Sequence, residues 1–225
     1  MKITGAIFDM DGTLIDSLGF WDILWEKLGE TYLGDKSFRP DPVTERAVRT
    51  STLYDAAAII HRNCGIGESE ESLFKTVDAL LLWHYEENVE MKKGAIDFLE
   101  YLLSRGVRMC VATATAPHLL EVLMKKFGLK RFFPRVFSCN DVGHGKESPA
   151  VFDAAHAWLG GERETTFVFE DSVVAVETAA KAGYKVVGVY DKYGFAEEKI
   201  EALSTVYIDK NTTLSSLKNN TELFQ

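Results

Sequence analysis

The sequence is poor in cysteine and in long apolar stretches, and each shortage excludes a class of protein. Its 225 residues include three cysteines, Cys64, Cys110 and Cys139, which lie far apart and form no CxxC or Cys/His spacing. We therefore expect free thiols in a reducing compartment rather than disulfides or a zinc site. No apolar run approaches the ~18 residues of a membrane-spanning helix, and no leader with an apolar core is visible at the start. These absences predict a cytoplasmic protein with no membrane partner.

Positive charge is also scarce. The chain has 25 Lys and Arg residues against 34 Asp and Glu residues, which gives a formal net charge of −9 at pH 7. A protein that binds nucleic acid needs a basic face to displace counterions from the phosphates. The nearest approach to a basic cluster, in residues 125–131, lies where a helix is expected to end, and the helix dipole favours basic residues there. We therefore expect no nucleic acid as a partner.

Short apolar runs alternate with helical patterns along most of the chain. The runs cover residues 3–8, 107–112, 136–138, 166–169, 186–189 and 206–208, and several helical patterns between them end at glycines such as Gly106, Gly128 and Gly183. Strands that are apolar throughout and alternate with helices are typical of a parallel sheet covered by helices on both faces. The sequence therefore predicts an α/β fold with a doubly wound parallel sheet.

The stretch after the first apolar run departs from this alternation, because residues 16–90 contain helical patterns alone. The patterns cover residues 20–32, 53–63 and 70–89, and the last carries Leu73, Val77, Leu80, Leu81 and His84 on one stripe. A crossover between parallel strands normally uses a single helix. We therefore predict a core of residues 1–15 and 91–225 that contains the sheet. Residues 16–90 are predicted to be an inserted all-helical subdomain that could cover the ligand-binding edge of the sheet.

Charged and hydroxyl side chains follow four of the predicted strands, and the carboxyl ends of strands in such a sheet lie at one edge, where ligands bind. In chain order they are Asp9, Asp11, Thr113, Lys146, Glu170 and Asp171. Side chains two apart in an extended strand share a face, so Asp9 and Asp11 are expected side by side. Two adjacent carboxylates cannot both ionise cheaply, so one can act as a nucleophile while the other carries a proton.

A phosphate monoester is a substrate that these groups fit. A phosphate charge ~4 Å from a carboxylate feels about 4 kcal/mol of repulsion at an effective dielectric of roughly 20, so cations must offset it. Lys146 supplies one positive charge, and a metal ion held by Asp9 and Asp171 supplies more. Oxygen ligands with few carboxylates suit Mg²⁺, and Thr113 can donate its hydroxyl hydrogen to a phosphoryl oxygen.

Four segments together resemble a known family: DMDGTLIDS from residue 9, VAT from 111, GKESP from 145 and FEDS from 169. They are similar to the motifs of the haloacid dehalogenase-like hydrolase superfamily, in the branch with beta-phosphoglucomutase and phosphoglycolate phosphatase, in the same order over nearly the whole chain. The resemblance implies a Rossmann-like core with a helical cap inserted after the first strand. It also implies a phosphatase that hydrolyses a small phosphorylated metabolite through an aspartyl phosphate. One departure is that Pro149 follows Lys146 after two residues, where the family often has Pro directly after Lys.

The resemblance also implies a role for each residue. Asp9 attacks phosphorus, and Asp11 protonates the leaving oxygen and then activates water. Thr113 and Lys146 hold the transferring phosphoryl group. The resemblance implies that Mg²⁺ is bound by Asp9, by the backbone carbonyl of Asp11 and by Asp171, with Glu170 as a further ligand or as a partner of one.

Taken singly, these residues have simpler interpretations. A Thr after a strand is often a helix cap, and Thr115 is better placed than Thr113 to cap a helix beginning at Pro117. A lone lysine is usually a solvated surface residue, and Glu170-Asp171 alone could cap the next helix. Trp21 is interpreted first as packing within the helical subdomain. The sharper hypothesis is that it faces the pocket and selects the substrate.

Two other functions stay open. A beta-phosphoglucomutase-like sugar-phosphate mutase shares the motifs, but typically has a His near Gly19-Phe20-Trp21 and a Val where Thr13 stands, so both departures favour hydrolysis. A signalling receiver domain also combines Asp, Thr and Lys around Mg²⁺, but lacks an acid pair on its first strand and a helical insertion. The identity of the substrate is not readable from the sequence, and a monomer is the expected state.

Overall fold

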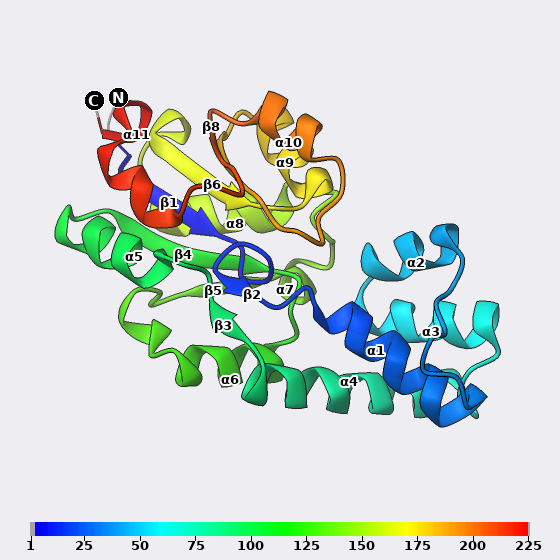
Figure 1. Ribbon diagram of the computed structural model, residues 1–225. Coiled ribbons are helices and arrows are strands. Elements are labelled where there is room, and N and C mark those ends of the chain that lie inside the picture. Colours follow the sequence, from blue (N-terminus) through cyan, green and yellow to red (C-terminus); the bar gives the residue numbers. More distant parts are fainter. Residues whose placement is uncertain (1–2, 225) are drawn as a thin grey trace. The chain divides into compact units, whose positions relative to one another are not determined.

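The computed structural model describes residues 3–224, and its central element is a six-stranded sheet in which every strand is parallel to its neighbours (Figure 1). The strands are β1 (Gly5–Phe8), β4 (Arg108–Thr113), β5 (Val136–Ser138), β6 (Thr166–Glu170), β7 (Lys185–Val189) and β8 (Val206–Ile208). Their order is β5-β4-β1-β6-β7-β8, so the chain builds outward from β1 in one direction and from β6 on in the other. The predicted doubly wound α/β fold is confirmed. Residues 1, 2 and 225, at the ends of the predicted core, lie outside the described residues.

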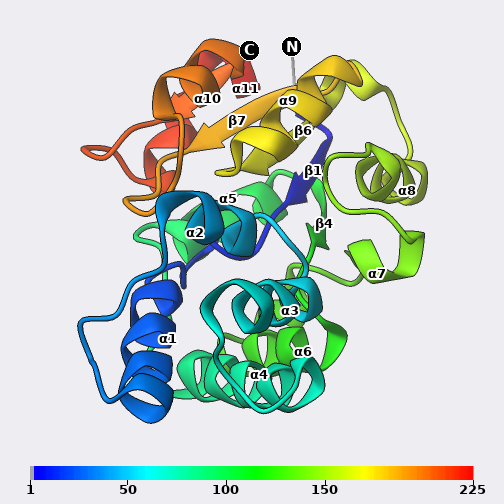
Figure 2. The same cartoon turned by 90° about the vertical axis from the view of Figure 1, so that its right-hand side faces the viewer.

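Helices cover both faces of this sheet, because side chains that alternate along each strand point to opposite sides (Figures 1 and 2). The helices are α5 (Ala95–Ser104), α6 (Pro117–Lys126), α7 (Cys139–Val142), α8 (Ala150–Leu159), α9 (Val173–Lys181), α10 (Glu197–Leu203) and α11 (Thr221–Phe224), with 3-10 turns η2 (Leu129–Arg131), η3 (Arg163–Thr165) and η4 (Leu214–Asn219). Helices α8 and α9 pack on the face that carries Ile7 and Val168. Helix α5 packs on the other face, where the ring centroid of Phe98 lies 5.8 Å from that of Phe169.

Residues 18–88 form a second compact unit made of helices and their connecting turns. Its elements are α1 (Phe20–Leu28), a π-helical turn η1 (Gly29–Leu33), α2 (Pro42–Arg49), α3 (Leu53–Cys64) and α4 (Glu70–Glu87). This unit has its own apolar core, which includes Leu24, Trp25, Ile60 and Val77, all fully buried. It therefore has the buried apolar centre that a separately packed unit requires. That it serves as a cap stays a prediction.

A short antiparallel ladder marks where the chain leaves the larger unit and where it returns. Strand β2 (Ile15–Asp16) pairs with β3 (Glu90–Met91), with Ile15 opposite Met91 and Asp16 opposite Glu90. The backbone N–H of Lys92 then donates to the carbonyl of Leu14 at 2.8 Å. The two ends of the helical insertion are thus held next to each other by backbone hydrogen bonds.

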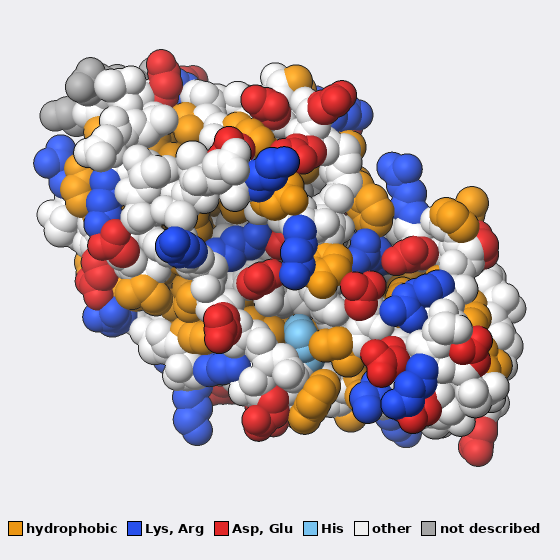
Figure 3. All heavy atoms as spheres, in the orientation of Figure 1, with side chains coloured by type: hydrophobic (Ala, Val, Ile, Leu, Met, Phe, Trp, Pro, Cys, Tyr) orange, Lys and Arg blue, Asp and Glu red, His pale blue; other side chains and the backbone are white. Residues whose placement is uncertain are grey.

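The surface carries charge of both signs. On the face shown in Figure 3, Lys and Arg side chains are interspersed with Asp and Glu and do not gather into one basic patch. None of the helices within residues 3–224 has both the length and the apolar character needed to cross a bilayer.

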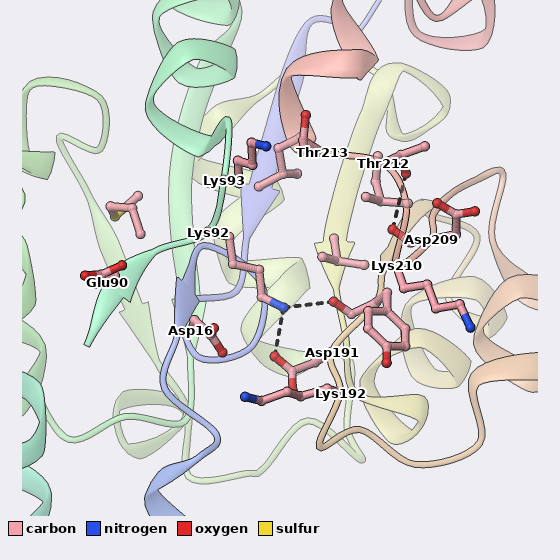
Figure 4. A pocket seen from close by; sticks show the side chains of 15 residues that line it. Asp16, Glu90, Lys92, Lys93, Asp191, Lys192, Asp209, Lys210, Thr212 and Thr213 are labelled. Carbon is pink, nitrogen blue, oxygen red and sulfur yellow. Dashed lines mark hydrogen bonds and ion pairs between the residues drawn. The ribbon is translucent and has the colours of Figure 1, made fainter. Parts of the chain in front are cut away.

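An open pocket of about 570 Å³ lies in the larger unit, lined in part by the β2–β3 ladder (Figure 4). Its charged lining residues are Asp16, Glu90, Asp191, Asp209, Lys92, Lys93, Lys192 and Lys210. Acids and lysines are present in equal number, so the lining favours neither an anion nor a cation. Figure 4 shows Lys92 pointing to Asp191, which closes the ion pair at the centre of this surface.

Lys92 ties the ladder to the loop after β7. Its Nζ donates to the carbonyl oxygen of Tyr190 and to Oδ2 of Asp191, both at 2.8 Å. The side chains of Lys92 and Asp191 are 16% and 1% exposed. If one partner is removed, water can therefore solvate little of the charge that remains. Removing one partner of a buried pair leaves an uncompensated charge, which is usually more costly than removing both.

We expect Lys92→Met to lower the free energy of unfolding by about 3 kcal/mol, because the buried Asp191 carboxylate loses its counterion. Chemical denaturation at neutral pH measures the change. The double variant Lys92→Met/Asp191→Asn is expected to recover most of the loss. A double variant no more stable than Lys92→Met would show that the pair itself, rather than the orphaned charge, carries the energy.

Candidate active site

The acid pair lies at the carboxyl end of the central strand β1. Asp9 follows Phe8 directly, is 7% exposed, and is held by its backbone N–H, which donates to the carbonyl of Phe169 on β6 at 3.0 Å. Gly12 turns the chain with φ of +80°, a conformation that side chains other than glycine rarely adopt. A Cβ at Gly12 would also collide with the carboxylate of Asp171. The motif at β1 and the motif after β6 therefore need glycine at this position to approach each other.

Lys146 brings a positive charge to Asp9 and to Glu170. Its Nζ forms ion pairs with Oδ1 of Asp9 and with Oε1 of Glu170, the latter at 2.5 Å. The Lys146 side chain is 12% exposed. Burial by itself lowers the pKa of Lys146, but the two carboxylates outweigh it and raise the pKa above its ordinary value. The lysine therefore stays charged throughout the physiological range.

Glu170 and Asp171 complete the acidic group at the end of β6. Both Glu170 oxygens are engaged: Oε1 by Lys146, and Oε2 by the backbone N–H groups of Asp171 and Ser172 at 3.1 and 3.0 Å. Asp171 accepts a hydrogen bond from the Thr13 hydroxyl at 2.8 Å. Asp171 is thus oriented by Thr13 from the first motif, and Glu170 is oriented by Lys146 and by the backbone N–H groups of the two residues that follow it.

Three carboxylates meet at this point. Asp9, Glu170 and Asp171 each offer an oxygen, and these oxygens lie within 4.8 Å of one another. Burial raises the pKa of Asp9 to about 7, although Lys146 acts in the opposite direction. Burial and then the charges of Glu170 and Asp9 also raise the pKa of Asp171 well above its ordinary value. Three buried acids against one ammonium group leave an excess of negative charge, which fits a divalent cation with oxygen ligands.

Thr113 and Thr115 lie at and just after the end of β4. Thr113 is 1% exposed, and its Oγ1 accepts from the backbone N–H of Thr115 at 3.1 Å and donates to Thr115 Oγ1 at 3.0 Å. Thr115 Oγ1 in turn donates to Oδ2 of Asp11 at 2.5 Å. The other carboxylate oxygen of Asp11, Oδ1, accepts from the Ser17 hydroxyl at 2.6 Å. A continuous row of hydroxyl groups therefore joins Thr113 to Asp11.

The interpretation of Thr115 as a helix cap is wrong. The N-cap of α6 is Ala116, which makes no side-chain capping bond. Because Pro117 occupies the first turn and has no N–H, that helix end has fewer donors to satisfy. The Thr115 hydroxyl is used by Asp11 instead, a partner that is 104 residues away in sequence.

The predicted site residues form two contact groups in the structure. Lys146 joins Asp9 to Glu170, and Asp171 lies beside both acids. Thr115 joins Thr113 to Asp11, whose charge in turn raises the pKa of Asp9. Thr13, Ser17 and Thr115 are contacts that sequence reasoning missed. The first two lie inside the segment that carries the family resemblance, so the sequence placed them near the site but did not show which residues they contact. Trp21 lies in the separate helical unit, half-buried, with its ring centroid 5.6 Å from that of Phe20. Its role in substrate choice stays a prediction.

The site combines buried acids, a largely buried ammonium group and hydroxyl donors at the carboxyl ends of parallel strands. Phosphoryl-transfer enzymes use groups of these kinds at this place in the fold. The comparison with known families agrees. A family model for haloacid dehalogenase-like hydrolases matches residues 3–183, and the chain belongs to that family. The family predicted from the four motifs is confirmed.

Individual relatives agree with this assignment. The chain is 29% identical over 214 residues to a phosphoglycolate phosphatase of Rhodospirillum rubrum, covering 90% of this chain and 85% of the relative. It is 24% identical over 214 residues to a phosphorylated carbohydrates phosphatase of Thermotoga maritima, covering 95% and 97%. The crystal structure of CbbY from Rhodobacter sphaeroides in complex with phosphate superposes with a TM-score of 0.80 at 21% identity, covering 98% of this chain and 99% of that one. This last likeness shows a common fold.

Proposed function

We propose that this chain is a Mg²⁺-dependent phosphatase that hydrolyses a small phosphorylated metabolite through an aspartyl phosphate on Asp9. The enzyme class, a hydrolase of phosphate esters, follows from the family together with relatives that are named phosphatases. The observation that carries the proposed mechanism is the largely buried Lys146, which contacts both Asp9 and Glu170. Its positive charge lies where an anionic nucleophile must meet an anionic phosphoryl group.

In the first step, a carboxylate oxygen of Asp9 attacks phosphorus and the bond from phosphorus to the ester oxygen breaks. Asp11 gives its proton to that leaving oxygen, so an alcohol departs rather than an alkoxide. Lys146 and the Thr113 hydroxyl hold the phosphoryl oxygens in line with the attack. The Thr113 hydroxyl, which donates to Thr115 Oγ1, has to turn to the phosphoryl oxygen for this purpose.

In the second step, a water oxygen attacks phosphorus and the bond to Asp9 breaks. Asp11, now a carboxylate, accepts a proton from that water, and Asp9 is regenerated as a carboxylate while inorganic phosphate leaves. Asp11 is placed for this exchange by hydroxyl groups on both of its oxygens. Each carboxylate oxygen has a further lone pair, so accepting those hydrogen bonds leaves room for the transferred proton.

A divalent cation fits the residues present. Oxygens of Asp9 and Asp171, with the backbone carbonyl of Asp11, are the proposed ligands. Glu170 is placed second because its Oε2 already accepts two backbone hydrogen bonds and its Oε1 faces the Lys146 ammonium group. Glu170 is then proposed to orient Lys146 more than to bind the metal. Bound Mg²⁺ would neutralise the charge that gathers on the phosphoryl oxygens.

The raised pKa values of Asp9 and Asp171 predict how metal binding depends on pH. Between the ordinary value of 3.8 and about 7, the metal-free folded protein holds more protons than the unfolded chain, so its stability falls as pH rises through this window. Mg²⁺ needs these carboxylates deprotonated, so its stabilising effect is expected to grow over the same window. Thermal unfolding in EDTA and in excess Mg²⁺ should differ by about 3 kcal/mol near pH 8 and by much less near pH 5. An equal difference at both values would contradict these ligands.

The substrate class is proposed from relatives. Their names include phosphoglycolate, phosphorylated carbohydrates and, at 29% identity over 175 residues covering 76% of this chain, a hexitol phosphatase of Escherichia coli. A structural neighbour is named a putative beta-phosphoglucomutase, so a sugar-phosphate mutase is the second candidate. Because a likeness to that structure at 23% identity carries the fold alone, hydrolysis of a small sugar or organic-acid phosphate is proposed first.

The test is a screen of sugar phosphates, polyol phosphates and phosphoglycolate with Mg²⁺ and with EDTA, measuring released phosphate. We expect Mg²⁺-dependent multiple turnover of at least one ester. Glucose phosphates are followed for isomerisation as well as hydrolysis, which separates a phosphatase from a mutase. A single turnover without release of further phosphate would favour a receiver domain and end the proposal.

Three further expectations remain proposals: a cytoplasmic location, a monomeric state and a role for Trp21 in substrate choice. For the last, Trp21→Ala is expected to raise the KM of the best substrate more than it changes kcat. Trp83→Ala, which removes an exposed tryptophan of the same unit, is the control. An unchanged KM in Trp21→Ala would assign the ring to packing alone.

A further inference from the structure

The hydroxyl row beside Asp11 has a part that the proposed chemistry does not use. Thr113 is accounted for as a phosphate contact and Asp11 as the acid and base, but Thr115 stands between them and touches both. Its hydroxyl donates to Asp11 Oδ2 at 2.5 Å and accepts from Thr113 Oγ1 at 3.0 Å. A hydroxyl group has one hydrogen, so the hydrogen of Thr115 is committed to Asp11.

Thr115 is anchored to the sheet rather than to a free loop. Its backbone N–H donates to Thr113 Oγ1 at 3.1 Å, and Thr113 is the buried last residue of β4, paired in register with Ser138 of β5. A hydrogen bond to an ionised carboxylate is among the stronger ones in proteins, and a short distance adds to its strength. The position of Asp11 Oδ2 is therefore tied to the strand end of β4.

The second oxygen of Asp11 is held from a different direction. Oδ1 accepts from Ser17, the last residue of the larger unit before the helical unit begins at residue 18. A change of backbone conformation at that boundary would therefore reach Ser17 directly. Thr115, which is fixed to β4, offers a contact that does not depend on that boundary.

We propose that Thr115 is a positioning residue that orients the Asp11 carboxylate for hydrolysis of the aspartyl phosphate, an inference that rests on the proposed function. In that step the water oxygen forms a bond to phosphorus, the bond from phosphorus to Asp9 breaks, and Asp11 receives the water proton. The water must meet an Asp11 oxygen at a fixed angle, and Thr115 keeps the carboxylate plane in place. When phosphate binds, the Thr113 hydroxyl turns to it and Thr115 loses the hydrogen bond that it accepts from Thr113. The hydrogen bond that Thr115 donates to Asp11 stays intact.

The two half-reactions should respond differently to the loss of this hydroxyl. An aryl phosphate has a leaving oxygen that needs little protonation, so formation of the aspartyl phosphate depends weakly on Asp11. Its hydrolysis depends on Asp11 fully, because water is a poor nucleophile without a base. A variant that lacks the Thr115 hydroxyl should therefore form the phosphoenzyme and break it down slowly.

The experiment compares Thr115→Val, which keeps the shape and removes the hydroxyl, with Thr115→Ser, which keeps the hydroxyl. Rapid-quench measurement with an aryl phosphate and Mg²⁺ gives kcat, KM and the fraction of enzyme carrying phosphate. For Thr115→Val we expect kcat to fall roughly 10- to 100-fold with KM unchanged or lower, and the phosphoenzyme to accumulate. Thr115→Ser should restore kcat to within a few fold and abolish the accumulation.

Several outcomes would overturn the proposal. Thr115→Val with unchanged kcat would do so, as would a lower kcat without accumulated phosphoenzyme, or a Thr115→Ser variant that folds but is not rescued. If Thr115→Val fails to fold, Thr115→Ala is measured by the same criteria. Failure of the proposed function is separate, because the unaltered protein would then show no phosphoenzyme and no turnover with any ester.

Discussion

Asp9→Asn is expected to lose roughly 10⁴-fold or more of the phosphatase activity, because the neutral amide cannot attack phosphorus. The same change should leave the fold intact. It removes one charge from a buried group of three carboxylates, and the charged form of Asp9 is disfavoured by its burial, which raises its pKa to about 7. In EDTA near pH 8, the variant should therefore unfold at the same temperature as the unaltered protein or higher.

A matched control distinguishes loss of the nucleophile from loss of a buried acid. Asp191 is 7% exposed, as is Asp9, and it follows β7, the strand next to β6. It forms an ion pair with Lys92 and accepts a hydrogen bond from the backbone N–H of Tyr193, and its charge is the smallest of the influences that raise the pKa of Asp171. Asp191→Asn should retain activity. Substantial activity in Asp9→Asn, measured by phosphate release after removal of traces of unaltered enzyme, would reject Asp9 as the nucleophile.

Lys146→Met is expected to reduce kcat roughly 10²- to 10³-fold and to destabilise the metal-free protein by about 3–5 kcal/mol. Both effects have the same source. The Lys146 ammonium is the counterion of two carboxylates, Asp9 and Glu170, whose side chains are 8% and 1% exposed. Without this ammonium group, the phosphoryl group loses a positively charged contact, and Asp9 and Glu170 lose their counterion. Near pH 5 the stability loss should shrink, because Asp9, whose pKa burial raises to about 7, takes up a proton there.

Lys92→Met is the matched control for this variant. Lys92 is another largely buried lysine that pairs with an aspartate at a strand end. It follows β3 in the chain, whereas the acid pair precedes β2, and it serves no proposed chemical step. Stability should fall in both variants, measured by chemical denaturation, and kcat only in Lys146→Met. If kcat falls to the same degree in both, the effect of Lys146 is one of stability, and its assignment to the phosphoryl group is wrong.

The strands of the sheet were predictable because each carries a local signal. A strand buried on both faces is apolar along its length, and glycine marks the ends of several neighbouring helices, so the six runs match β1 and β4 to β8 within a few residues. The convergence of the site residues followed from one further rule, the common edge of parallel strands. Both inferences need only short stretches of sequence and the geometry of the peptide chain.

The features that escaped prediction depend on partners far along the chain. Strands β2 and β3 have two residues each and no pattern of their own, and they form because residues 15 and 91 meet. Helix α2 was missed since it is short and mostly exposed, although Asp41 caps it and Pro42 opens it. The local sequence favoured Thr115 as a helix cap, but its hydroxyl donates instead to the carboxylate of Asp11, which is 104 residues away.

The β2–β3 ladder makes the whole helical unit, in topological terms, the loop of a two-stranded hairpin. Asp16 and Glu90 face each other across that hairpin, so the segment between them starts and finishes at one point of the larger unit. A turn of a few residues could join β2 to β3 without changing the order of the six central strands. The segment between β2 and β3 can therefore be lengthened, shortened or exchanged in evolution while the sheet and its acidic edge stay unchanged.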